Sequence, residues 1–113
     1  GEIVTTDFKS AGHGVYLFCG GTAEQKTAAW ERFTALARAG KAASAWAVEN
    51  GLAEAVMKMS LGNEVGFAAA STALDWYQPM PGAIVAELTE EIPDAVCIGV
   101  TTAEKTQRRG EHF

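Results

Sequence analysis

The sequence predicts an α+β domain in which a mixed β-sheet is flanked by helices. Two short apolar runs are each followed by a segment of helical periodicity, and the later apolar runs follow one another without a helix between them. Strands joined through a helix run parallel and strands joined by a turn run antiparallel, so we expect mixed strand directions. The 113 residues suit one domain, residues 1–113, and leave open whether helices cover one face of the sheet or both.

The first strand and the first helix have clear boundaries. Residues 14–19 are β-branched, aromatic and apolar, which indicates a buried strand, and a pair of glycines ends it. A helix begins after Thr22, because its hydroxyl and the side chain of Gln25 form the pattern of a capping box. An apolar stripe continues to Arg38, and Gly40 supplies the left-handed residue that ends the helix.

The rest of the chain predicts four strands and one helix. Residues 43–48 are small and apolar, and although composition alone would allow a helix, the glycines on either side favour a short strand. A second helix follows, and Gly62 and Asn63 end it. Its apolar residues recur at helical spacing: Leu52, Ala55, Val56 and Met59. The remaining segments are strands over residues 65–70, 83–88 and 95–100 and a loop over residues 75–82.

Composition and charge exclude several classes of protein. Apolar residues make up 48% of the chain and charged residues 20%, which is typical of a globular protein. The net charge of -5 disfavours binding to nucleic acid or to an anionic membrane. No apolar run approaches the ~20 residues that cross a membrane, and no signal peptide is visible, so we expect a cytoplasmic protein. The chain does not begin with Met, which fits a segment of a longer protein.

The sequence contains no motif of a known catalytic site. A P-loop, a dinucleotide fingerprint and the common hydrolase motifs are all absent from it. Its carboxylates are scattered over loops and strand ends. Examples are Asp75, Glu87, Glu90, Glu91 and Asp94. We therefore predict neither a catalytic residue nor a metal site.

Five further residues are expected to be structural or exposed. Cys19 and Cys97 lie in apolar strand-like runs and are expected to be buried, reduced thiols. His13 and His112 match no Cys-His signature and are expected on the surface or in loops. Trp30 belongs to the apolar stripe of the first helix, and we expect it in the core.

The turn at Asn50 and Gly51 is the candidate binding site. The start of a helix presents free N–H groups and the positive end of the helix dipole, and a glycine there lets an anion approach the backbone. Asn50, Gly51 and Leu52 would therefore lie close to a bound phosphate, with Asn50 capping the helix. The same residue types begin many helices that bind nothing, so both interpretations stay open.

Four segments carry a family resemblance. They are Asp-Phe-Lys-Ser-Ala-Gly at 7–12, Arg-Ala-Gly-Lys at 38–41, the stretch 44–67, and Ile-Gly-Val-Thr-Thr at 98–102. Within 44–67 the matching residues are Gly51, Ala53-Glu54-Ala55, Lys58-Met59, Gly62-Asn63 and Gly66-Phe67. In this order the segments resemble the second AIR-synthase-related C-terminal domain of large, single-chain phosphoribosylformylglycinamidine synthase.

The resemblance implies a domain of an ATP-dependent ligase of purine biosynthesis. The family converts formylglycinamide ribonucleotide and glutamine to formylglycinamidine ribonucleotide, using ATP and Mg²⁺. Its metal-binding acids lie in an ATP-binding domain and its Cys nucleophile in a glutaminase domain. These two domains are the implied partners, ATP and Mg²⁺ would be bound mainly by them, and the isolated domain would be inactive.

The turn departs from the family's pattern at one position. The active half of the enzyme has paired glycines with a His or Asp just upstream, whereas this chain has Asn50 before Gly51 and Ala-Val-Glu at 47–49. A Cβ on Asn50 hinders the close approach of an anion. The resemblance thus implies the second half, where the turn is part of a structural nucleotide site.

A second class of function remains open from the sequence. The chain would also suit a small, non-enzymatic interaction or regulatory module that self-associates through a sheet edge, and the isolated domain would then form a homodimer. Trp76 and Tyr77, in a predicted loop, are expected to contact a neighbouring domain.

Overall fold

The structure is a computed structural model that describes residues 5–70 and 74–103. It confirms the α+β class, and each predicted helix and strand is present with ends within two residues of those expected. The elements are β1 (Gly14–Phe18), α1 (Ala23–Arg38), β2 (Ala42–Val48), α2 (Leu52–Leu61), β3 (Gly66–Ala69), β4 (Ala83–Leu88) and β5 (Val96–Thr102).

The five strands form one sheet in the order β2-β4-β1-β5-β3. Each of its four pairings is antiparallel, whereas the sequence favoured mixed directions. The strands joined through helices do run parallel to one another, as a helical crossover requires. They are not neighbours, however, because β4 lies between β1 and β2, and β4, β1 and β5 lie between β2 and β3. Sequence patterns indicate the connections but not which strands insert between them.

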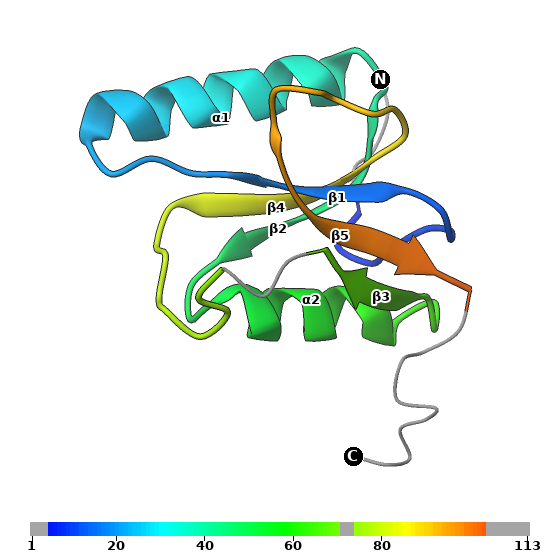
Figure 1. Cartoon of the computed structure of the whole chain (residues 1–113). Coiled ribbons are helices and arrows are strands. Elements are labelled where there is room, and N and C mark those ends of the chain that lie inside the picture. The colour runs from blue at the N-terminus through cyan, green and yellow to red at the C-terminus, as the bar shows by residue number, and fades with distance from the viewer. Residues whose placement is uncertain (1–4, 71–73, 104–113) are drawn as a thin grey trace.

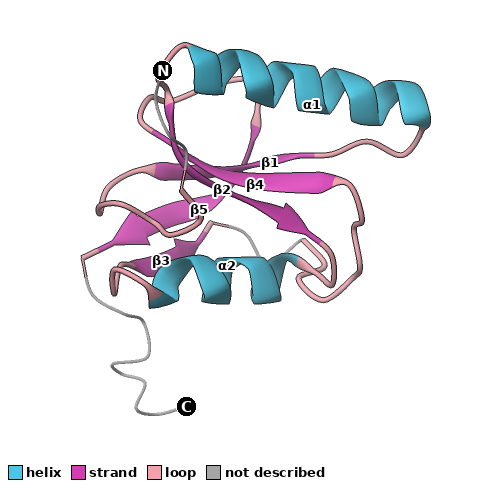
Figure 2. Ribbon diagram, turned by 180° about the vertical axis from the view of Figure 1, so that it is seen from behind, coloured by secondary structure: helices cyan, strands magenta, loops and turns pink. Residues whose placement is uncertain are grey.

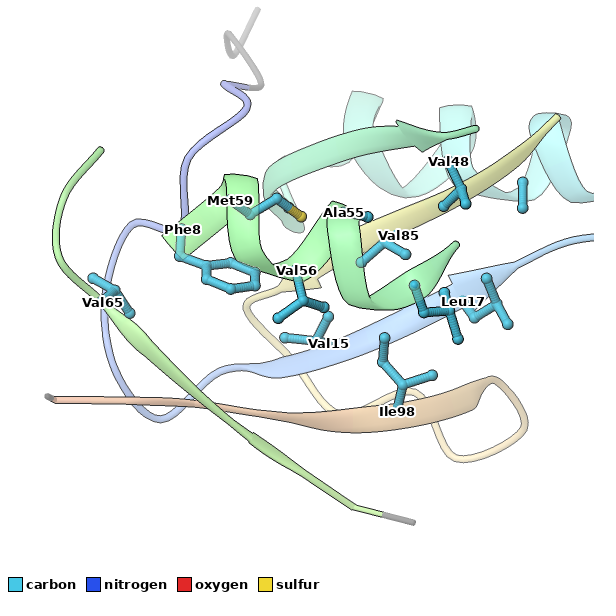
Figure 3. Close-up of a cluster of buried hydrophobic side chains, with 12 residues drawn as sticks. Phe8, Val15, Leu17, Val48, Ala55, Val56, Met59, Val65, Val85 and Ile98 are labelled. Carbon is cyan, nitrogen blue, oxygen red and sulfur yellow. The ribbon is translucent and has the colours of Figure 1, made fainter. Parts of the chain in front are cut away.

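The helices cover opposite faces of the sheet, so the domain has three layers (Figure 1). The same arrangement is seen from behind in Figure 2, where α1 and α2 lie on either side of the strands. Phe33 of α1 packs on one face with residues of β1, β2 and β4. On the other face, α2 packs on side chains of β1, β2, β4 and β5, and Phe8 closes the end of this core (Figure 3).

Local sequence signals explain both ends of α1. The Thr22 hydroxyl accepts from the Gln25 N–H at 3.1 Å, and the Gln25 side chain accepts from the Thr22 N–H at 3.2 Å, which is the predicted capping box. At the other end Gly40 has φ +78°, its N–H bonds the Ala37 carbonyl, and the Lys41 N–H bonds the Leu36 carbonyl. This pattern is a Schellman motif, and it confirms Gly40 as the residue that ends the helix.

Three expectations about burial were wrong. Trp30 is 58% exposed, because α1 buries only Phe33 completely and the Trp30 ring lies at the margin against Phe33, with centroids 6.0 Å apart. Cys19 is exposed because it lies one residue beyond the end of β1. Cys97 is exposed because it is on β5, whereas α1 packs on β4, β1 and β2. The expectation for His112 lies outside the described residues.

Candidate functional site

The predicted turn begins α2, but not in the way the sequence suggested. Gly51 is the N-cap, with φ +142°, and no side chain caps the helix there. The Asn50 amide instead donates to Oε1 of Glu54 at 3.1 Å, so the expectation that Asn50 caps the helix was wrong. Asn50 is exposed, whereas Gly51 and Leu52 are buried. The helix start at Gly51 and Leu52 therefore faces protein rather than solvent.

The loop between β3 and β4 covers this helix start. The Ala53 N–H, one of the free donors of the first turn, bonds the Trp76 carbonyl at 2.9 Å. A Cβ at Gly51 would lie 2.9 Å from the Trp76 carbonyl oxygen and 3.1 Å from the Tyr77 carbonyl carbon. Glycine is thus required both by the backbone angle and by the approach of this loop. The close approach that the sequence assigned to an anion is made by the protein's own backbone.

The charge around the turn is negative. Glu49 precedes it, Glu54 lies in the first turn of α2, and Asp75 lies in the covering loop, where its Oδ1 accepts from the Tyr77 N–H at 3.1 Å. Three carboxylates repel a phosphate and oppose the favourable end of the helix dipole. The placement of Asn50, Gly51 and Leu52 near a nucleotide stays a prediction, and these charges favour a structural part for the turn.

The strongest polar cluster of the described residues surrounds Glu87. Its side chain is 0% exposed, and it is the last residue but one of β4. Oε1 accepts from the Lys9 N–H at 2.8 Å and from the Ser44 hydroxyl at 2.7 Å. Oε2 accepts from the Ser10 N–H at 3.2 Å and from Nδ1 of His13 at 2.6 Å. Four donors thus satisfy one buried carboxylate, which is the condition under which such a group is tolerated.

This cluster fixes the segment before β1 against the sheet. Thr101 of β5 adds to it, since its hydroxyl donates to the Ser10 carbonyl at 2.7 Å and accepts from the His13 N–H at 2.9 Å. His13 lies in a loop, as expected, but it is only 24% exposed and is hydrogen-bonded to Glu87. The ring presents its other nitrogen, Nε2, away from this bond. The arrangement orients the imidazole and holds residues 8–13 in place.

Sequence reasoning missed Glu87 because it was counted among carboxylates of loops and strand ends. A signal was present: the residue stands inside the apolar strand Ala-Ile-Val-Ala-Glu-Leu, whose six residues are all buried. A carboxylate in such a strand needs dedicated donors. Those donors come from residues 43 or more positions away in the chain, so the pattern indicates their existence but not their identity.

A shallow apolar groove lies beside the covered turn. It has a volume of about 350 Å³ between α2, β3 and the covering loop. Its lining is Ala53, Val56, Phe67, Ala69, Trp76 and Tyr77. Tyr77 is 80% exposed, and the Phe67 and Trp76 rings meet edge to face at 5.8 Å. The groove offers aromatic and aliphatic contacts and no charged group.

A metal site is not formed by the residues that the structure describes. Within 5–70 and 74–103, no three His, Cys, Asp or Glu side chains are placed to hold an ion. In the same ranges no helix has the length and apolarity needed to span a bilayer.

Comparison of the chain with protein-family models, with curated proteins and with solved structures found no match.

Proposed function

We propose that this chain is a domain of an ATP-dependent ligase of purine biosynthesis. The parent enzyme would be phosphoribosylformylglycinamidine synthase, acting in the cytoplasm. The domain would support a nucleotide site that an ATP-binding domain builds, beside a glutaminase domain, and it would not be catalytic alone. ATP and Mg²⁺ would be held by residues of those other domains.

The observation that carries this proposal is that three of the four family-like segments meet in space. Asn63 Nδ2 donates to the Phe8 carbonyl at 2.8 Å, across 55 positions of the chain. The Thr101 hydroxyl bonds Ser10 across 91 positions, and the Gly12 N–H bonds the Thr101 carbonyl at 2.9 Å. Residues 7–12, 62–63 and 98–102 thus form one hydrogen-bonded unit. A resemblance spread over distant segments is better supported when those segments depend on each other.

One glycine of these segments has a direct steric reason. A Cβ at Gly62 would meet the carboxylate of Asp7, so the Asp7 side chain would have to turn away to make room for it. Both residues belong to the segments that resemble the synthase. The contact brings two distant family-like segments together, and this supports the proposal.

Titration calorimetry with ATP and Mg²⁺ tests the supporting role of the domain. We expect no binding tighter than about 1 mM for the isolated chain, since the described residues include no cluster of three His, Cys, Asp or Glu side chains that could hold a metal ion. Micromolar binding that disappears in Gly51→Val would show that the turn itself binds the nucleotide. The second test is the genomic reading frame, which we expect to continue into a glutaminase domain.

One observation favours the alternative of a self-associating module. β3 lies at the edge of the sheet, and its residues Gly-Phe-Ala-Ala carry no charge and no proline that would block pairing with another strand. Sedimentation of the unchanged chain and of the Ala68→Lys variant measures the oligomeric state of each and decides this point. A dimer that dissociates on this substitution would favour the module, whereas a monomer in both cases would remove its support.

A further inference from the structure

Helix α2 carries apolar side chains on its outer side as well as on its inner side. Its buried residues are Leu52, Ala55, Val56 and Met59. On the outer side Met57 is 57% exposed and Leu61 is 60% exposed. Ala53, Met57 and Leu61 are four residues apart, so they form one stripe about 12 Å long. Because Met57 and Leu61 are exposed, the stripe is an apolar face of α2 that no other described residue covers.

The stripe is continuous with the groove beside the covered turn. Ala53 belongs to both, since it also lines the groove of about 350 Å³ with Trp76 and Tyr77. Tyr77, the most exposed large apolar residue described, stands at the far end. We call the surface formed by Ala53, Met57, Leu61 and Tyr77 the outer α2 surface. It is long enough to contact about two turns of a helix.

The segments that carry the outer α2 surface contain more acidic than basic side chains. Within residues 49–64 and 74–77 the acidic side chains are Glu49, Glu54, Glu64 and Asp75. The same ranges contain one basic side chain, Lys58, and its ammonium lies 5.8 Å from the centre of the Trp46 ring, toward β2. Glu54 lies three positions before Met57 and seven before Leu61, so it shares the outer side of α2 with them. With four acidic side chains and one basic, these segments carry a net charge of -3 beside exposed apolar side chains.

We propose that the outer α2 surface binds an amphipathic helix of a partner protein, apolar on one side and rich in Lys and Arg at its flanks. The apolar side packs against Met57 and Leu61 as helix ridges pack into grooves. The basic flanks meet Glu54 and Asp75, which sets orientation and accelerates association. A second copy of this chain is a poor occupant, because its net charge of -5 would face the same carboxylates. The inference does not depend on the proposed function.

The test uses a helical peptide of about 18 residues in which Leu recurs at i, i+3, i+4 and i+7 and Lys occupies the other positions. A peptide of the same composition in permuted order is the first control, and a Leu/Glu peptide is the second. We expect the Leu/Lys peptide to bind more tightly than either control, and its affinity to fall as salt rises. Equal binding of the permuted peptide would overturn the proposal, because charge alone would then explain it.

Two variants locate the site on the chain. Met57→Gln with Leu61→Gln removes the apolar stripe without changing charge, and we expect about tenfold weaker binding of the Leu/Lys peptide. Trp30→Gln removes an equally exposed apolar residue on the opposite face and should leave binding unchanged. Equal loss of peptide binding in both variants, or no loss of binding in the Met57→Gln with Leu61→Gln variant, would contradict the proposed location of the site.

Folding, charge and self-association are each measured separately. Denaturant unfolding of the double variant should match that of the unchanged chain, since both side chains are exposed. Glu54→Gln with Asp75→Asn leaves the apolar stripe in place and should weaken binding of the Leu/Lys peptide while reducing its salt dependence. A dimer of the unchanged chain that dissociates in Met57→Gln with Leu61→Gln would assign the surface to self-association and overturn the proposal.

Discussion

Replacing Glu87 by Gln should destabilise the domain far more than its small change in size suggests. In the native chain two donors share Oε1 and two share Oε2. Glutamine is neutral, keeps one oxygen and places an NH₂ group where the other stood, so two donors lose their acceptor and the other two keep only an uncharged one. His13 can relieve part of this by moving its proton to Nε2, which makes Nδ1 an acceptor.

The size of the effect follows from these contacts. A hydrogen bond to a charged group contributes about 1.5 to 3 kcal/mol, and two are lost with partial compensation at His13, so we expect about 3 kcal/mol. For 113 residues the entropy of unfolding is about 0.24 kcal/mol/K, and a loss of 3 kcal/mol lowers Tm by about 12 °C. Glu91→Gln is the matched control, because Glu91 is exposed shortly after the same strand, and its Tm should not move.

Thermal and urea unfolding give the stability, and amide hydrogen exchange locates the change. Exchange at the Lys9 and Ser10 amides should accelerate in Glu87→Gln, since both N–H groups bond this carboxylate. The reasoning would be refuted if the Glu87→Gln variant had the same Tm and urea midpoint as the Glu91→Gln variant, and if the Lys9 and Ser10 amides kept their protection from exchange. The buried carboxylate would then not hold the segment before β1.

Three other substitutions test separate parts of the structure. Gly51→Val should cost about 2 kcal/mol by urea unfolding, because φ is +142° and the new Cβ would meet the backbone of the covering loop, and unchanged stability would contradict this contact. Phe33→Ala should cost about 3 kcal/mol and Trp30→Ala less than about 1 kcal/mol, since only Phe33 is buried, and equal costs would contradict the observed face of α1. The hydrogen bond from Arg32, followed by its charge, holds the pKa of Asp94 below its ordinary value. Because the pKa is lower in the folded state, the ionised Asp94 stabilises the fold at a pH above the unfolded-state pKa, and this stabilisation is lost as the pH falls through the folded-state pKa. Asp94→Asn should therefore lower the urea midpoint slightly at neutral pH and leave it unchanged in strong acid.

Local signals in the sequence were sufficient to predict the helices and strands of the fold. Thr22 and Gln25 predicted the start of α1, Gly40 predicted its end, and residues 83–88 coincide with β4. These features depend on neighbours in the chain. Strand order depends on contacts between distant segments, and so the antiparallel insertion of β4 between β1 and β2 was not predictable from the patterns.

The same distinction applies to the candidate site. Gly51 was correctly singled out as a residue that needs to be glycine, but the group that approaches it is the backbone of Trp76 and Tyr77, 25 or more positions later. Trp30 has the spacing of a core residue, yet burial depends on where the sheet lies beneath the helix. Glu87 could be recognised as unusual in its strand, whereas its donors could not be named.

The proposed function is tested best by an assay of the protein encoded by the complete reading frame that contains this domain. Formation of formylglycinamidine ribonucleotide from the formylglycinamide compound is measured with ATP, Mg²⁺ and glutamine. We predict activity for the complete protein and none for residues 1–113 alone. A reading frame that encodes only this domain, or a complete protein without this activity, would contradict the proposed function.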